Sequence, residues 1–116
     1  MAANPPKLLS LSDMQLSETA ARFEGRDHGA SMSFFVTDHP PGGTVPLHHH
    51  PYEEVFIVRE GTATFSVDGE TVEAEAGNVV IVPAGAAHGF ANKADGALRM
   101  VSIHPNDHVV QEWLED

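Results

Sequence analysis

Three consecutive histidines, His48, His49 and His50, are the first residues whose spacing suggests chemistry. In a β-strand, side chains two residues apart point to the same face of the sheet. His48 and His50 would therefore project together, and His49 would project the opposite way. Imidazole nitrogens presented in this manner are common ligands of transition metals.

A carboxylate and a fourth side chain complete this set. Glu54 shares its strand face with Phe56 and Val58, whereas Glu53 would face away. A carboxylate that faces an apolar interior is costly unless it is paired or bound to a metal. His88 opens another predicted strand later in the chain. We therefore expect one divalent transition metal ion per chain, with Fe, Mn, Ni, Zn and Cu all open, held by His48, His50, Glu54 and His88.

The elements that must position these residues are short strands. Segments rich in β-branched and aromatic residues recur along the chain, separated by turn residues such as Asp68-Gly69. This pattern favours an all-β barrel or sandwich, and the length suits one domain over residues 1–116. The predicted strands are Thr19–Phe23, Ser31–Thr37, Thr44–His48, Glu53–Val58, Thr62–Val67, Thr71–Ala74, Val79–Val82, His88–Ala91 and Leu98–His104.

The two ends of the chain give weaker signals. Residues 1–7 contain two prolines and predict a loose lead-in, and Leu8–Leu11 is a candidate edge strand. The tail over residues 107–116 has apolar residues at helix-like spacing. We expect a short C-terminal helix over Asp107–Leu114, with Trp113 anchoring it on the barrel or on a partner subunit.

Two glycine-framed motifs identify a family resemblance. The first has Gly42, His48, His50, Glu54 and Gly61 at the spacing of the first cupin motif, and the second has Gly77, Pro83, Gly85, His88 and Asn92 at the spacing of the second. The chain therefore resembles the cupins. The resemblance implies a double-stranded β-helix of jelly-roll type, a metal held by the four residues named above, and often a homodimer.

The surroundings of the expected metal suggest a pocket for a small molecule. Three neutral imidazoles, one carboxylate and a divalent ion carry a net charge of +1, which favours an anionic organic ligand. Phe56, Phe90 and Met100 are the expected pocket residues. Tyr52 and His104 are candidates for acid–base catalysis, although Tyr52 could be a turn residue with an exposed hydroxyl and His104 a structural histidine.

The resemblance allows several functions. We expect a metal-dependent enzyme acting on an organic acid, enol or phenol, of dioxygenase, isomerase, decarboxylase or cyclase type. The alternative is a non-catalytic binding or sensing module that uses the same cavity. The fold and motifs do not choose between them, because function depends on the pocket rather than on the barrel.

Composition restricts the partners. The chain has 6 Lys and Arg against 17 Asp and Glu, a net charge of −11, which disfavours nucleic acid and membrane partners. It has no cysteine, so thiolate metal sites are excluded, and we expect a cytoplasmic protein. A homodimer would use Leu8–Phe23 for pairing. The remaining basic groups have ordinary expected roles: His28, His39 and His108 in surface or turn positions, and Arg22 and Arg99 in surface ion pairs or on a substrate carboxylate.

Overall fold

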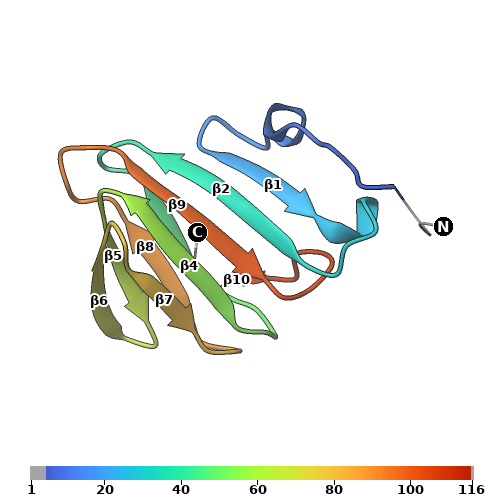
Figure 1. Cartoon of the computed structure of the whole chain (residues 1–116). Helices are drawn as coiled ribbons and strands as arrows, with labels where there is room; N and C mark the ends of the chain where they lie inside the picture. The colour runs from blue at the N-terminus through green and yellow to red at the C-terminus, as the bar shows by residue number, and fades with distance from the viewer. Residues whose placement is uncertain (1–4, 116) are drawn as a thin grey trace.

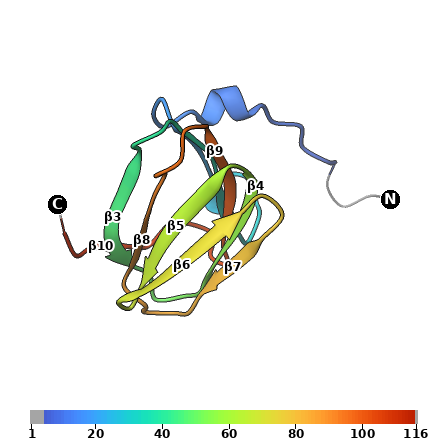
Figure 2. The same ribbon diagram turned by 90° about the vertical axis from the view of Figure 1, so that its left-hand side faces the viewer.

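Two antiparallel five-stranded sheets face each other in the computed structural model, which describes residues 5–115 (Figures 1 and 2). The first sheet has the order β1 (Ala20–Glu24), β2 (Ser33–His39), β9 (Leu98–His104), β4 (Glu54–Glu60) and β7 (Val79–Val82). The second has the order β10 (Glu112–Trp113), β3 (Thr44–His49), β8 (His88–Ala91), β5 (Thr62–Val67) and β6 (Glu70–Glu75). The predicted all-β class is confirmed.

The core lies between the sheets and follows the alternation of the strands. In β4 the buried residues are Glu54, Phe56 and Val58, and in β9 every second residue from Leu98 to His104 is buried. The rings of Phe56 and Phe65 meet across the two sheets with centroids 4.9 Å apart. β4 and β9 therefore each have one face in an apolar interior, where an ionised side chain needs a partner.

Strand register brings the expected ligands together. β3 pairs with β8 so that His48 lies opposite His88, although the two residues are distant in sequence. β4 lies between β7 and β9 in the other sheet. On that side Val55 pairs with Ile103, which places Glu54 beside the end of β9. One end of the interior thus collects polar side chains from both sheets.

The two predictions for the chain ends were wrong. Leu8–Leu11 forms no strand: residues 5–10 are irregular, a 3-10 helix follows over Leu11–Met14, and Leu8 is 99% exposed. The tail forms no helix over Asp107–Leu114. It is irregular apart from β10, because its backbone groups bond to other parts of the chain, as with the Leu114 amide that donates to the Leu47 carbonyl. Of the predicted lead-in over residues 1–7, residues 1–4 lie outside the described residues.

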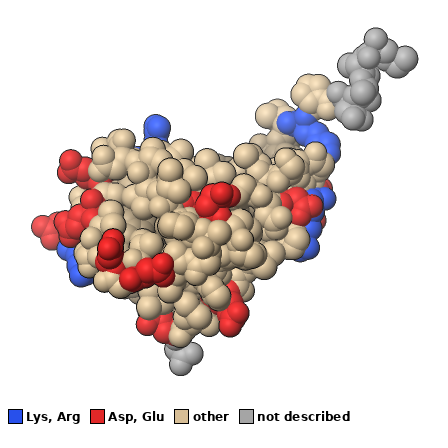
Figure 3. Space-filling view, turned by 90° about the horizontal axis from the view of Figure 1, so that it is seen from below, with Lys and Arg blue, Asp and Glu red and all other residues tan. Residues whose placement is uncertain are grey.

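The surface is acidic, as the composition requires. Acidic side chains are spread over the face seen in Figure 3, and basic ones are few on it. Arg99 pairs with two carboxylates, Asp38 at 3.1 Å and Glu60 at 3.3 Å, as a surface residue. Within residues 5–115, no helix has the length and apolar character needed to span a membrane.

Candidate metal centre

Four buried side chains converge at one end of the interior. His48 comes from β3, His50 from the segment just after it, Glu54 from the start of β4 and His88 from the start of β8. One ligand atom from each residue lies within 4.8 Å of the ligand atoms of the other three. The structure therefore brings together all four predicted ligands.

The three imidazoles are held in one tautomer by the backbone. Each ring places its Nδ1 against a backbone carbonyl, and because a carbonyl only accepts, we assign the hydrogen to Nδ1 in each ring. Nε2 is then free to present its lone pair to a metal. The bonds run from His48 to Pro46 (2.8 Å), from His50 to Val110 (2.8 Å) and from His88 to Ala86 (2.9 Å).

Glu54 supplies the negative charge at the centre of the group. Its Oε1 lies 3.0 Å from the Nε2 of His50 and 3.0 Å from the Nε2 of His88. Lone pairs on all three atoms would repel one another, so this arrangement requires a cation, either a proton or a metal ion. The donor set suits a divalent transition metal, and the residues present therefore fit such an ion.

The acid–base properties of the group agree with this arrangement. Burial raises the pKa of Glu54, but the contacts with His104, His50 and His88 outweigh it and hold the pKa well below its usual range. Burial lowers the pKa of His88, but hydrogen bonds to Glu54 and Ala86 raise it above its ordinary value. In the metal-free protein a proton on His88 would thus occupy the place that a metal ion takes.

His48 behaves differently from His88. Burial lowers its pKa to about 4, more than the hydrogen bond to Pro46 raises it. His48 is therefore neutral and ready to ligate at physiological pH. His49 projects away from the group and lies 3.4 Å from Glu112 of β10, as strand alternation predicts.

His104 and Tyr52 form a second layer behind Glu54. The Nε2 of His104 lies 3.0 Å from Glu54 Oε2, and its Nδ1 lies 2.7 Å from the Tyr52 hydroxyl. The amide of Val110 donates to the same hydroxyl at 3.1 Å. Tyr52 is thus no exposed turn residue, and the ring of His104 is buried against a metal ligand. Their catalytic role stays a prediction.

An apolar cavity of about 310 Å³ opens from the metal centre. His48, Glu54 and His104 line its polar end, and the predicted pocket residues Phe56 and Phe90 line its wall. Met100 is buried in the core but is not among the lining residues. Sequence reasoning missed several contributors, namely Phe35, Thr37, His39, Val45, Gln111 and Trp113.

His39 departs from its predicted surface position. It is 6% exposed, its ring meets Phe90 edge-on at 5.1 Å, and its Nε2 has no hydrogen-bond partner among the described residues. The buried position of His39 was not predicted, because the predicted strand ended at Thr37. In the structure β2 continues to His39, and strand alternation then turns the ring inward. His28 and His108 are partly exposed, in keeping with surface positions.

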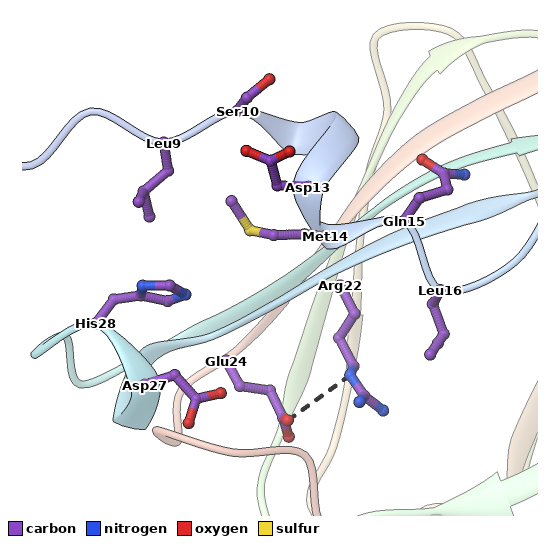
Figure 4. A pocket seen from close by; sticks show the side chains of 10 residues that line it. All are labelled: Leu9, Ser10, Asp13, Met14, Gln15, Leu16, Arg22, Glu24, Asp27 and His28. Atoms are coloured by element: carbon purple, nitrogen blue, oxygen red, sulfur yellow. Dashed lines mark ion pairs between the residues drawn. The ribbon is translucent and has the colours of Figure 1, made fainter.

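A second hollow of about 400 Å³ lies between the N-terminal segment and β1 (Figure 4). Arg22 lines both this hollow and the apolar cavity, and its Nε lies 3.7 Å from Glu24 Oε1. Its side chain is 38% exposed. Arg22 therefore stands at the mouth of the cavity, within reach of solvent, rather than at the metal.

Comparison with known proteins agrees with this site. Residues 35–104 match the model of the cupin domain. The chain is 32% identical over 80 residues to an uncharacterised protein of Streptomyces coelicolor, covering 69% of this chain and 74% of that protein. It is 39% identical over 62 residues to polyketide synthase CurC of Streptomyces cyaneus, covering 53% of this chain and 40% of that protein.

Solved structures give the same fold. Oxalate decarboxylase OxdC of Bacillus subtilis matches with a TM-score of 0.79 and 25% identity, over 90% of this chain and 31% of that one. A formate complex of Lactobacillus farciminis oxalate decarboxylase matches with a TM-score of 0.78 and 23% identity, over 89% and 34%. The Bacillus enzyme has Mn(II) centres. This chain spans about a third of each decarboxylase and less than half of CurC.

Proposed function

The chain belongs to the cupin domain family, and from that premise we propose that it is a metal-dependent enzyme acting on a mainly apolar enol, phenol or diketone. One observation carries the proposal: the ligands His48 and Glu54 line the same cavity as Phe35, Phe56 and Phe90. A compound in that cavity would place an ionised oxygen at the metal and its carbon skeleton against the phenyl rings.

The charge of the site supports an anionic reacting group. Three neutral imidazoles, the Glu54 carboxylate and a divalent ion sum to +1, which an enolate or phenolate oxygen neutralises. A bound Mn or Fe ion would supply Lewis-acid stabilisation of that oxygen. The chain's own residues hold the skeleton and exclude water, since Phe56 and Phe90 are at most 9% exposed.

The cavity favours such a compound over a small dianion. Oxalate, the substrate named for the structural relatives, carries two carboxylates and no apolar surface. Among the residues that line this cavity, Arg22 is the only Lys or Arg, and it stands at the mouth. The name of the relative CurC, a polyketide synthase, supports a substrate with several enol or keto oxygens.

The metal site is tested by elemental analysis of protein purified without added metal. We expect close to one equivalent of a transition metal per chain, lost in the His48→Ala, His50→Ala double variant. His49→Ala is the matched control, because it removes the same side chain from the same stretch on the opposite face. Equal metal content in the double variant and the control would refute the site.

The activity is tested with the Mn- and Fe-loaded protein against panels of diketones, phenols and polyphenols. Oxygen uptake reports a dioxygenase, released CO₂ a decarboxylase, and a product of unchanged mass an isomerase. Loss of water from a polyketone reports a cyclase. Turnover should disappear in the double variant and persist in the control.

A non-catalytic binding module is the second candidate. The observation that favours it is that Tyr52 does not line the cavity, while His104, which does, already lies 2.7 Å from the Tyr52 hydroxyl and 3.0 Å from Glu54. A compound that binds to the metal-loaded protein and is recovered unchanged, with and without oxygen, would establish this alternative.

A further inference from the structure

A fourth imidazole, that of His104, lies against the metal centre without belonging to the set of four donors. The ring of His104 is 4.7 Å from the ring of His50, nearer than the 5.0 Å between His48 and His50 themselves. Its Nε2 lies 3.0 Å from Glu54 Oε2, and its side chain is 1% exposed. A neutral imidazole this close to a metal site can ligate, yet His104 is not one of the four residues whose donor atoms all lie within 4.8 Å of one another. One contact helps to keep it apart.

That contact is the hydroxyl of Tyr52. The Val110 amide donates to the Tyr52 oxygen, so the phenolic hydrogen is free to donate to His104 Nδ1, 2.7 Å away. A neutral imidazole whose Nδ1 accepts carries its hydrogen on Nε2. We assign that tautomer to His104. It is the opposite of the tautomer in the three histidine ligands, whose Nδ1 atoms face carbonyls.

The surroundings of Nε2 favour the same assignment. An Nε2–H 3.0 Å from the ionised Oε2 of Glu54 is attracted to that oxygen electrostatically, although the ring is not aligned for a hydrogen bond to it. The two carboxylate oxygens of Glu54 also face different histidines. Oε1 faces His50 and His88, and Oε2 faces His104.

We propose that Tyr52 is a positioning residue that keeps His104 out of the coordination shell of the metal. By holding the hydrogen on Nε2 it removes the lone pair that a metal needs. This inference rests on the proposed metal site and deepens it. With four protein ligands, a six-coordinate ion keeps two positions for substrate and co-substrate.

Removing the hydroxyl should convert His104 into a ligand. In Tyr52→Phe nothing donates to Nδ1, so the ring can carry its hydrogen there and turn the Nε2 lone pair to the metal. The metal would gain a fourth imidazole and lose an open position. His104→Phe leaves the metal with its original three imidazoles.

Pulsed EPR of the Cu(II)-loaded protein counts the coupled imidazoles directly. We expect three in the wild type, four in Tyr52→Phe, and three in both His104→Phe and the Tyr52→Phe, His104→Phe double variant. Four in the wild type, or three in a Tyr52→Phe protein that holds its full copper content, overturns the inference. A wild type that binds no copper at these residues refutes the metal site itself, and the inference falls with it.

If the Tyr52→Phe variant fails to fold, a measurement on the wild type alone still tests the inference. In the Zn(II)-loaded protein, ¹⁵N–¹H correlation of the imidazoles reports which ring nitrogen carries hydrogen. His104 should be protonated on Nε2, and His48, His50 and His88 on Nδ1. A His104 ring protonated on Nδ1 overturns the inference although the metal site stands.

Discussion

His50 and Val110, 60 residues apart in the chain, are joined by a 2.8 Å hydrogen bond from the ring Nδ1 to the backbone carbonyl. The amide of the same Val110 donates to Tyr52. One peptide segment of the tail thus orients a metal ligand and the hydroxyl behind it. The tail is in turn held by β10, where Glu112 and Trp113 pair with His49 and His48.

Shortening the tail should therefore weaken metal binding. Deletion of residues 111–116 removes β10 and leaves Val110 at a free end, so the orientation of His50 and Tyr52 is lost. Loss of such supporting contacts typically lowers metal affinity about 10- to 100-fold. Competition with a chelator measures the change. Leu114→Ala is the control, because it keeps the backbone bond to Leu47, and equal affinity in both proteins would contradict the argument.

Glu54 and Glu53 should differ sharply although they are neighbours. Glu54 is 3% exposed and faces three imidazoles, whereas Glu53 is exposed. Glu54→Gln removes the ligand charge, and we expect metal affinity to fall by more than about a hundredfold, since loss of a supporting contact alone costs about 10- to 100-fold. Glu53→Gln should retain one equivalent of metal. Elemental analysis after dialysis measures the metal content of the two variants. A similar loss of metal in both would count against the site.

Metal affinity should rise with pH through the titration of His88. Its pKa in the metal-free protein is raised, so the ring carries a proton at pH 6.5 that the metal must displace. The pKa of His48 is about 4, so His48 does not compete above pH 5. Below the His88 pKa, affinity should increase about tenfold per pH unit from this one proton. Metal titrations between pH 5.5 and 8 measure the slope.

An imidazole NMR titration of the metal-free protein checks the order of the two groups. His88 should change its protonation first as the pH falls, and His48 only near pH 4. Protonation of His48 before His88 would show that burial does not determine the order of the two pKa values.

His39 should make the protein less stable in mild acid. Burial lowers its pKa below 6.5, although Asp38 raises it in part. The unfolded chain therefore takes up the proton more readily, and the free energy of unfolding falls as the pH drops below 6.5. His39→Phe removes this loss, so its stability relative to the wild type should increase between pH 7.5 and pH 5. Urea denaturation at both values measures it, and a constant difference would contradict it.

Three of the metal ligands could be predicted from local rules, whereas His88 was predicted from the spacing of the second motif. Alternation in a strand separates His48 and His50 from His49, and Glu54 from Glu53, whichever strands lie beside them. The positions of most strands follow from the same two-residue period and from turn residues. The parity of His48, His50 and Glu54 needs no knowledge of which distant segments meet, whereas His88 reaches them only through the pairing of β3 with β8.

The remaining features depend on long-range pairing. Tyr52 and His104 meet only because β9 lies beside β4, and the ring of His39 turns inward only because β2 extends to pair His39 with Leu98. The tail has the apolar spacing of a helix, yet the backbone of Val110 bonds elsewhere. Its carbonyl accepts from His50 and its amide donates to Tyr52. Tertiary hydrogen bonds of this kind override a weak helical preference.

Gly61 closes the first motif for a steric reason that a mutation can isolate. Gly61 and Gly69 have nearly equal left-handed φ values, 82° and 83°. A Cβ on Gly61 would lie 2.3 Å from the Ala97 carbonyl oxygen, whereas a Cβ on Gly69 has nothing within 4 Å. Gly69→Ala should lower the free energy of unfolding by about 1–2 kcal/mol, the cost of the left-handed backbone.

Gly61→Ala carries the same backbone cost together with the clash, which only a shift of the strand ends can relieve. We expect it to be at least about 2 kcal/mol less stable than Gly69→Ala, in the range of a core overpacking. Because Gly61 follows the end of β4 opposite Glu54, the shift should leave the metal content unchanged. Urea denaturation and elemental analysis of the two variants test this. Equal stabilities would show that glycine is needed at position 61 only for its left-handed backbone.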